Sequence, residues 1–182
     1  MDKKLYPMGK TSLFIACSLD GYIAAPGNNL DFLSCVEDGD EDYGYHDFVN
    51  KVDTVIVGRK TYDWVEKHAS YPHTDKKSYV ISTRGGEAKE NLQFYNGDVA
   101  QLVSQLKADG HQIYCEGGAD ILHQLLMKDM IDEMIISYIP VLLGGGTLLF
   151  KPGTPMLKYK LISVQTYPKG LMQVRYERDQ FI

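Results

Sequence analysis

The stretch CEGGADILHQLL, residues 115–126, passes from an apolar strand into an amphipathic helix through two adjacent glycines. After the glycines, apolar residues recur at helical spacing: Ile121, Leu122, Leu125 and Leu126. Glycine loses more conformational freedom on folding than other residues, so a pair indicates unusual backbone torsions or the close approach of another group. The first N–H groups of a helix also favour an anion. Gly117 and Gly118 therefore have two interpretations, a tight turn or a contact with a bound anion.

Strands and helices alternate on both sides of this stretch. Short apolar runs predict strands at residues 11–17, 53–58, 77–83, 111–116 and 132–142. Helical patterns occur near residues 42–51, 59–68 and 98–110, in addition to the helix after Gly118. Residues 18–32 contain glycine and proline breakers and predict a loop. The alternation predicts an α/β fold, with a mostly parallel central sheet flanked by helices on both faces.

The C-terminal tail predicts an antiparallel β-hairpin at one edge of this sheet. Two alternating segments, roughly 157–165 and 171–177, are joined by the turn Tyr167-Pro168-Lys169-Gly170. Both faces of this hairpin carry apolar side chains, from Tyr159, Leu161, Met172, Val174 and Tyr176. Because edge strands must be covered or paired, we expect a homodimer that buries part of the hairpin.

Composition predicts one globular domain over residues 1–182, with residues 1–9 as a poorly ordered N-terminal extension. The formal net charge is −5 and no basic cluster occurs, which argues against binding to nucleic acid or to an anionic membrane. We find neither an apolar run of the ~20 residues that a membrane span needs nor a signal peptide. The three cysteines form no CxxC motif and are expected to be reduced. Together these features predict a cytoplasmic protein.

Ligands of parallel sheets bind beyond the carboxyl ends of the strands, so the residues just after each predicted strand are candidates for a site. Gly58-Arg59-Lys60-Thr61 opens a helix with two cations, which indicates a phosphate partner or, alternatively, a solvated basic turn. Ser82-Thr83-Arg84 adds a third cation, with a turn before Gly85-Gly86 as the alternative. With Gly117-Gly118, these segments could hold a ligand with several phosphates, such as a dinucleotide. Asp20-Gly21, after the first strand, is also a common turn pair.

Several familiar motifs are missing from the sequence. No G-x-G-x-x-G follows the first strand and no G-x-x-x-x-G-K-[ST] occurs, so neither a standard Rossmann domain nor a P-loop is predicted. There is no G-x-S-x-G nucleophile motif. The five histidines lack the spacing of metal ligands, so no metal site is expected.

Four segments in this order resemble the bacterial dihydrofolate-reductase-like family: SLDGYIA (18–24), VIVGRKTYDWV (55–65), YCEGGADILHQLL (114–126) and IDEMIISYIPVLLGGGTLLF (131–150). That family shares its fold with dihydrofolate reductase and with the reductase domain of bifunctional riboflavin-biosynthesis proteins. The resemblance runs from about residue 10 to the C-terminus. It is specific for the family and not for a substrate.

The resemblance implies NADPH as the cofactor. Ala16 and Ile23 would border the nicotinamide, and the pyrophosphate would lie against Gly117 and Gly118. The remaining cofactor contacts that it implies come from three segments. Gly58, Arg59, Lys60 and Thr61 would hold phosphates. Ser82, Thr83 and Arg84 would surround the adenosine 2′-phosphate. At the start of the helix, Ala119 and Asp120 would contribute N–H groups and Ile121 would also contact the cofactor, with the Asp120 carboxylate turned away or capping the helix.

The resemblance further implies an NADPH-dependent reductase that transfers hydride to a pterin-like or pyrimidinone heterocycle. It would be similar to dihydrofolate reductase or to the riboflavin-pathway 5-amino-6-(5-phosphoribosylamino)uracil reductase. The alternative is a non-catalytic nucleotide-binding or regulatory protein that retains the fold.

The proton donor is expected in the acidic segment 37–42, because dihydrofolate reductase has one acidic residue in its first helix. Asp42 is the candidate, since it lies at a similar distance before Gly58-Arg59. The alternative is that this segment is a solvated acidic loop. Its negative charge makes it a poor host for a substrate phosphate.

Overall fold

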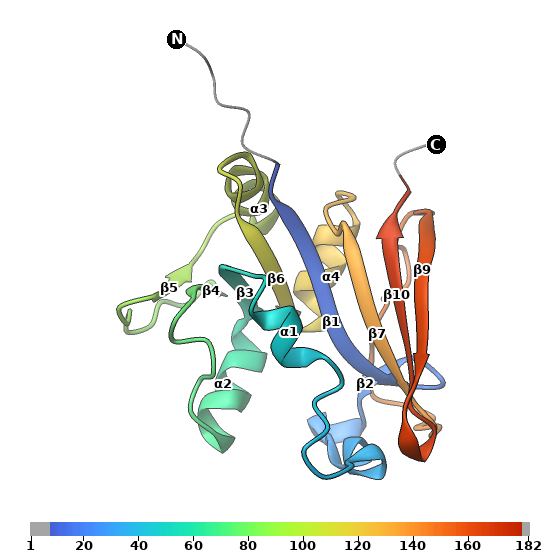
Figure 1. Ribbon diagram of the computed structural model, residues 1–182. Helices are drawn as coiled ribbons and strands as arrows, with labels where there is room; N and C mark the ends of the chain where they lie inside the picture. Colours follow the sequence, from blue (N-terminus) through green and yellow to red (C-terminus); the bar gives the residue numbers. More distant parts are fainter. Residues whose placement is uncertain (1–7, 180–182) are drawn as a thin grey trace.

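The computed structural model describes residues 8–179, which are arranged around one eight-stranded sheet (Figure 1). Its strands are β1 (Lys10–Ser18), β3 (Thr54–Gly58), β4 (Lys77–Ile81), β5 (Leu92–Tyr95), β6 (Gln112–Gly117), β7 (Glu133–Ile139), β9 (Tyr159–Thr166) and β10 (Met172–Arg178). They lie in the order β5-β4-β3-β6-β1-β7-β10-β9. Neighbours from β5 to β7 are parallel, and β10 is antiparallel to both β7 and β9. The predicted parallel sheet with an antiparallel C-terminal hairpin is confirmed.

Helices cover both faces of the sheet, as predicted. One face carries α1 (Tyr45–Val49) and α2 (Arg59–His68), and the other carries α3 (Val99–Ala108) and α4 (Ala119–Leu126) (Figure 1). Side chains alternate along β3, so Val55 and Val57 pack towards α1 and α2, while Ile56 packs towards α3 and α4. The sheet is therefore the middle of three layers.

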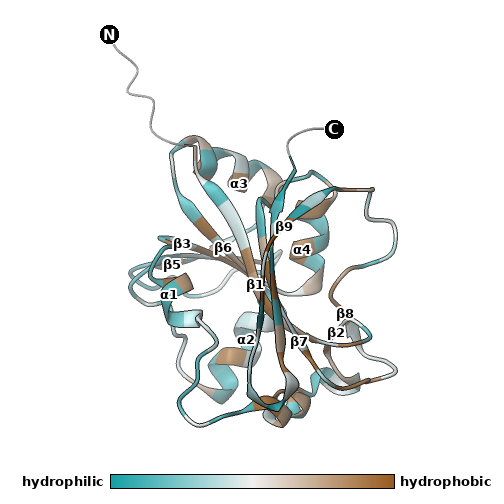
Figure 2. Ribbon diagram, turned by 45° about the vertical axis from the view of Figure 1, so that its right-hand side comes forward, coloured by the Kyte–Doolittle hydropathy of each residue, from teal (hydrophilic) through white to brown (hydrophobic). Residues whose placement is uncertain are grey.

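The main core lies between the sheet and the pair α3 and α4. The leucine stripe of α4 is buried there, with Leu122 and Leu125 at most 1% exposed. Figure 2 shows the apolar residues concentrated along the central strands and the hydrophilic ones in the outer loops. Burial of each such side chain stabilises the fold by about 1.5–3 kcal/mol. Asp98 caps α3, because its carboxylate accepts from the N–H groups of Ala100 and Gln101.

Three short strands were not predicted. β5 follows a polar loop and has only four residues. β2 (Tyr22–Ala24) lies inside a segment expected to be a loop and forms a separate two-stranded sheet with β8 (Thr147–Leu148). Such strands are too short to show alternation, and β2 pairs with residues more than 100 positions away. Short 3₁₀ turns occur at Pro26–Asn28, Asp31–Val36 and Pro168–Gly170.

The C-terminal hairpin turns through Pro168–Gly170, where the Tyr167 N–H donates to the Leu171 carbonyl at 2.9 Å. β9 is the outermost strand and is exposed along nearly its whole length. Its apolar side chains Leu161 and Val164 are 50% and 53% exposed. This edge of the sheet is therefore both open and partly apolar.

The predicted N-terminal extension falls largely outside the described residues. Only residues 8 and 9 of the extension are described, and of these Gly9 donates its N–H to the Lys107 carbonyl at 2.9 Å. Cys17 and Cys115 are buried free thiols, and Cys35 is exposed. Within residues 8–179 we find no helix with the length and apolar character that a membrane crossing requires.

Candidate functional site

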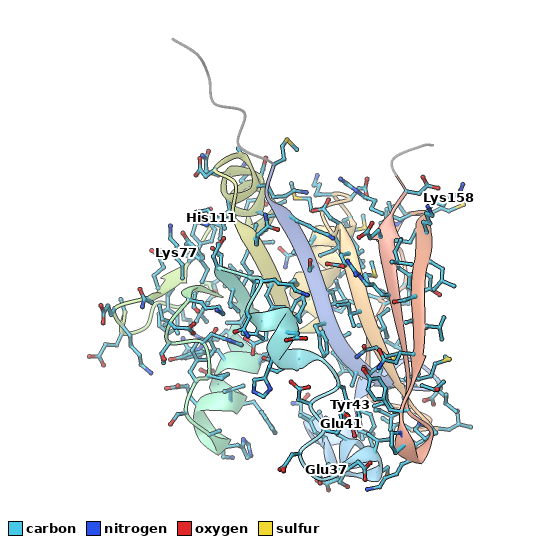
Figure 3. The ribbon with its side chains drawn as sticks, viewed as in Figure 1. Glu37, Glu41, Tyr43, Lys77, His111 and Lys158 are labelled. Carbon is cyan, nitrogen blue, oxygen red and sulfur yellow. The ribbon has the colours of Figure 1, made fainter. Side chains whose placement is uncertain are left out.

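The carboxyl ends of β1, β3, β4, β6 and β7 meet at one edge of the sheet, which is the lower edge in Figure 1. Apart from Ala16 within β1 and Ile23 on β2, the predicted cofactor residues lie at or just after the ends of these strands. Figure 3 shows Glu37 and Glu41 of the acidic segment near the same edge, whereas Lys77 and His111 lie towards the opposite one. The topology therefore brings together residues that are far apart in the sequence.

The two glycine-bearing helix starts contact each other directly. The Gly118 N–H donates to Thr61 Oγ1 at 3.1 Å, which joins the start of α4 to the first turn of α2. A Cβ on Gly58 would lie 3.1 Å from the side chain of Ile121, and a Cβ on Gly118 would lie 3.2 Å from Thr61 Oγ1. Gly117 has φ +108°, in the region that favours glycine. Both reasons for a glycine pair, unusual torsion and close approach, therefore apply here.

The first turn of α4 keeps unbonded N–H groups. Ile121 and Leu122 donate to the Gly118 carbonyl, but the N–H groups of Ala119 and Asp120 have no acceptor among the described residues. The Asp120 carboxylate forms an ion pair with Lys151 instead of capping the helix. Lys151 is the main cause that lowers the pKa of Asp120, and Lys60 also contributes. The helix start is thus free to bind an anion, beside an acid whose charge is already compensated.

The three predicted cations, Arg59, Lys60 and Arg84, differ in whether their charged groups are bonded within the protein. Arg59 is bound to Asp63 Oδ1 at 2.7 Å and to the Gly85 carbonyl at 3.2 Å, and it lies over the Phe94 ring. Lys60 and Arg84 are exposed, and neither forms an ion pair with a carboxylate in the described part of the chain. Arg59 therefore links the helix start to the loop after β4, while the other two remain available for an anion.

Ser82 is buried and shapes the loop after β4. Its hydroxyl accepts from the Arg84 N–H at 3.1 Å, and its own N–H donates to the Tyr95 carbonyl at 2.9 Å. This is the turn that was the alternative interpretation of the segment. Thr83 and Arg84 project from it as exposed residues.

Ala16 and Ile23 lie where β1 leads into β2, at the same edge. Ala16 is half-buried against a cluster that includes Phe32 and Ile139, and Ile23 is half-buried against the main core. Both leave part of their surface open, as a residue bordering a ring would. The cofactor assignments of this section remain predictions.

Asp20 has a role that its sequence context did not reveal. Its carboxylate accepts from Ser18 Oγ at 2.5 Å and from the Gly144 N–H at 2.7 Å, and Leu143 N–H is also within reach. These bonds tie the loop after β1 to the loop after β7. The Ser18 hydroxyl and then the backbone donors lower the pKa of Asp20 to about 2.

We expect an Asp20→Asn variant to lose stability in a pH-dependent way. The folded-state pKa is lowered, so the ionised clamp stabilises the fold above the unfolded pKa of about 4, and this contribution disappears as the pH falls towards about 2. Thermal melts of parent and variant across this range should therefore show a difference in Tm that shrinks on acidification. A difference that stays constant with pH would show that the charge of Asp20 does not matter.

Asp42, the predicted proton donor, caps the short helix α1. Its carboxylate accepts from the Gly44 N–H at 2.9 Å, the His46 N–H at 2.8 Å and His46 Nδ1 at 2.5 Å. The backbone bond from His46 is the largest cause that lowers the pKa of Asp42. Its proton-donor role stays a prediction that this geometry does not favour, because a lowered pKa keeps the group ionised.

Sequence reasoning missed a buried polar cluster next to the glycine pair. Glu116, the residue before Gly117, has Oε1 3.3 Å from Nε2 of His73. The same nitrogen is 3.4 Å from the Tyr45 hydroxyl. His73 lies in a loop without periodicity, 43 positions from Glu116, so no spacing could have connected the two. The one available signal was the place of Glu116 at the end of a predicted strand.

A cavity of about 310 Å³ lies away from the strand ends, between α1 and the hairpin β9–β10, on the face of the sheet that carries α1. Its polar lining centres on Glu133, which is bound by Ser12 Oγ, Lys10 Nζ and Arg175 Nε. None of the predicted cofactor residues lines it. Because its buried carboxylate is fully satisfied within the protein, we prefer the strand ends as the candidate site.

A family model, the RibD C-terminal domain, matches residues 10–173. The chain belongs to this family. The chain is 38% identical over 172 residues to the protein YwjB of Bacillus subtilis (strain 168), covering 93% of this chain and 98% of YwjB.

Two solved structures are similar to this chain. A putative riboflavin biosynthesis protein from Shewanella sp. PV-4 has a TM-score of 0.85 and 30% identity, with 94% of this chain and 99% of that chain covered. Dihydrofolate reductase from Enterococcus faecalis, complexed with NADP(H), has a TM-score of 0.66 and 15% identity, covering 97% and 100%. The second likeness concerns the fold alone. The dihydrofolate-reductase-like architecture and the relation to riboflavin-biosynthesis reductases, both expected from the sequence, are confirmed.

Proposed function

We propose that this protein is an NADPH-dependent reductase that transfers hydride to a pterin-like or pyrimidinone heterocycle. The observation that carries the proposal is the hydrogen bond from the Gly118 N–H to Thr61 Oγ1. It joins the start of α2 (residues 58–61) to the start of α4 (residues 117–120), and we call these two joined helix starts the cradle. The cradle offers the unbonded N–H groups of Ala119 and Asp120 and the free cations Lys60 and Arg84. Amides at a helix N-terminus and unpaired cations are the donors that phosphate groups prefer. Membership of the RibD C-terminal domain family supports the same function.

The residues of the cradle fit a phosphorylated dinucleotide. Gly117 and Gly118 leave room for a pyrophosphate against the backbone, since neither carries a Cβ. Lys60 would hold phosphates at the start of α2, and Arg84 would contact a 2′-phosphate in the loop after β4. When bound, NADPH supplies the hydride. Ala16 and Ile23 would hold the nicotinamide ring against the end of β1 and exclude water from one of its sides.

In this proposal the substrate would lie towards the acidic segment 37–42 and α1. Asp38 is paired with Lys169, but the carboxylates of Glu37 and Glu41 repel anions, which favours a neutral heterocycle over one that carries a phosphate near this segment. The free cysteines of the protein fit a reducing cytoplasmic setting.

The test of the proposal is consumption of NADPH by the purified protein with three kinds of acceptor: dihydrofolate, biopterin-like compounds and ribosylamino-pyrimidines. Oxidation that depends on one acceptor class supports the reductase and identifies its substrate class. Tight binding of NADPH without oxidation by any of them would instead indicate the non-catalytic nucleotide-binding alternative.

We expect a clear preference for NADPH over NADH, and we expect Arg84→Ala to weaken it. A charge-assisted contact to the 2′-phosphate is worth about 1.5 kcal/mol or more, so Arg84→Ala should raise the Kd for NADPH about tenfold. Lys77→Ala is the matched control, because Lys77 is an exposed cation towards the opposite edge of the sheet (Figure 3). Calorimetry should find the Kd for NADH unchanged in both variants. Equal affinity of the parent protein for NADPH and NADH would refute the assignment of Arg84.

We further propose a homodimer formed through the hairpin β9–β10. β9 presents an unpaired strand edge, with Leu161, Ile162 and Val164 each at least 40% exposed. The occupant that best matches such an edge is a second copy, which carries the same apolar surface. Val164→Lys should produce monomers in sedimentation velocity, whereas Lys158→Ala at the start of the same hairpin should leave dimers intact. A parent protein that is monomeric at micromolar concentration would contradict the proposal.

A further inference from the structure

Lys151 holds the carboxylate of Asp120 at the start of α4. Its Nζ donates to Asp120 Oδ1, and this ion pair is open to solvent, since the side chains of Lys151 and Asp120 are 38% and 61% exposed. Asp120 belongs to the cradle, and its N–H, like that of Ala119, has no acceptor among the described residues. Lys151 therefore lies beside the donors that we assign to the pyrophosphate, although it comes from a segment 31 positions away.

The segment after β8 is fastened along one face of α4. Leu149, which is 2% exposed, anchors the beginning of this segment in the main core. Further on, the Thr154 hydroxyl donates to the Lys151 carbonyl at 2.9 Å and lies 3.3 Å from His123 Nδ1. His123 and Asp120 are three residues apart, so they share one face of the helix. The backbone of Lys151 is thus held in place, while its side chain remains partly exposed.

Two cations from different segments act on the Asp120 carboxylate. The bond to Lys151 is the main cause that lowers the pKa of Asp120, and the charge of Lys60 contributes as well. Lys60 is exposed at the start of α2. A carboxylate repels an anionic ligand and a cation attracts one, so the two lysines together leave an excess of positive charge next to the unbonded N–H groups.

The ion pair between Lys151 and Asp120 contributes little to the fold. Exposed pairs of this kind add little stability, because both charged groups are well hydrated when they are apart. A diphosphate carries more negative charge than one carboxylate, and its oxygens accept strong, charge-assisted hydrogen bonds. The ammonium group of Lys151 has three N–H donors on a flexible side chain. Lys151 can therefore exchange Asp120 for a phosphate oxygen without a significant loss of stability.

We propose that Lys151 binds the pyrophosphate of the cofactor at the start of α4, and that Asp120 competes with the pyrophosphate for this lysine. The inference rests on the proposed function, of which it needs nucleotide binding alone. As the pyrophosphate reaches the N–H groups of Ala119 and Asp120, Lys151 Nζ leaves Asp120 Oδ1 and binds a phosphate oxygen. The ion pair forms again when the cofactor dissociates. Asp120 thereby limits the affinity for the cofactor, which favours release of its oxidised form after each reaction.

The role of Lys151 differs from the role assigned to Arg84. The pyrophosphate is common to NADPH and NADH, whereas the 2′-phosphate assigned to Arg84 occurs in NADPH alone. A substitution of Lys151 should therefore change the Kd values of both dinucleotides by the same factor. Adenosine 2′-monophosphate separates the two residues further, since it carries the 2′-phosphate but no pyrophosphate.

The test is calorimetry of NADPH and NADH with the full chain and its variants. Lys151→Ala should bind both dinucleotides about tenfold more weakly, because a charge-assisted contact is lost, and should keep the parent Kd for adenosine 2′-monophosphate. Asp120→Asn should bind both dinucleotides about three- to tenfold more tightly, because a like charge next to the pyrophosphate is removed. Lys128→Ala is the matched control and should keep the parent Kd values, since Lys128 is an exposed cation just beyond the other end of α4.

The double variant Lys151→Ala/Asp120→Asn decides what the lysine does. If Lys151 binds phosphate, the double variant binds NADPH several-fold more weakly than Asp120→Asn alone. A double variant that binds NADPH as tightly as Asp120→Asn would overturn the proposal, because Lys151 would then merely neutralise Asp120. Weaker binding by Asp120→Asn than by the parent protein would also overturn it, because the pair would then serve to fasten the segment after β8. Thermal melts without ligand verify folding, which these exposed substitutions should preserve.

The failures of the two proposals can be told apart. A parent protein that binds neither NADPH nor NADH refutes the proposed function and the role of Lys151 together. A parent protein that binds NADPH but reduces no acceptor refutes the reductase alone, and the variants still decide on Lys151. An active reductase whose double variant binds NADPH as tightly as Asp120→Asn refutes only the role of Lys151.

Discussion

A Gly118→Ala variant is expected to fold but to lose the rise in Tm that NADPH gives the parent protein. If the pyrophosphate lies against the backbone here, the new Cβ takes its place. At a ligand concentration of 100 times Kd, binding stabilises a protein by about 2.7 kcal/mol, which corresponds to about 5–10 °C for a chain of this size. The variant should show almost none of this shift.

The variant also has an internal contact, because its Cβ would lie 3.2 Å from Thr61 Oγ1. Thermal melts with and without NADPH should therefore include Thr61→Ala and the double variant Thr61→Ala/Gly118→Ala. We expect Thr61→Ala to lose part of the shift, because it removes the hydrogen bond to Gly118. We expect the double variant to melt higher than Gly118→Ala without regaining the shift. A Gly118→Ala protein that melts lower but keeps the full NADPH shift would mean that the glycines serve the turn alone.

The second large effect is expected at the loop after β7. Gly146 has φ +125°, and a Cβ there would lie 2.0 Å from the Ala24 carbonyl oxygen of β2. Such torsional strain costs about 1–3 kcal/mol, and the displaced backbone adds to it, so we expect Gly146→Ala to lower the stability by about 3 kcal/mol. For this chain length that is a fall in Tm of about 6–12 °C.

The neighbouring residue provides the control for this substitution. A Cβ on Gly145 would find its nearest neighbour, a carbon of Pro26, at 4.0 Å, so Gly145→Ala should melt close to the parent protein. Because Ile23 lies on the strand that Gly146→Ala displaces, we also expect weaker NADPH binding in that variant alone. Equal Tm values for the two alanine variants would show that β2 and β8 do not pair as described.

Most of the large elements were predictable from local sequence patterns. The apolar runs of β1, β3, β4, β6 and β7 marked the parallel strands, and Pro168 with Gly170 marked the turn of the hairpin. β2 and β8 were missed because two or three residues show no periodicity and the pairing joins Ala24 to Thr147. Strand β5 was missed for the same lack of length.

The part of the candidate site that follows directly after strands was predictable from the sequence, because ligands of parallel sheets bind at the carboxyl ends of the strands. The expectation that ligands meet strand ends selected Gly58, Thr61 and Gly118, and the fold brings these three together. It did not reveal that Asp20 holds the backbone of residues 143–144, nor that Glu116 meets His73. Both contacts join segments whose separation in sequence carries no pattern, so only the folded chain makes them visible.

The strand order has a consequence for how the chain is made. Among the described strands β1 comes earliest in the sequence, yet its two neighbours, β6 and β7, end only at Gly117 and Ile139. Until β6 is complete both edges of β1 lack their native partners, and until β7 is complete one edge still does, so its apolar run can associate with other nascent chains. Sheets built from such distant pairings also fold slowly, because long loops must close first. During biosynthesis residues 10–18 therefore lack at least one of their two partner strands until residue 139 has been translated.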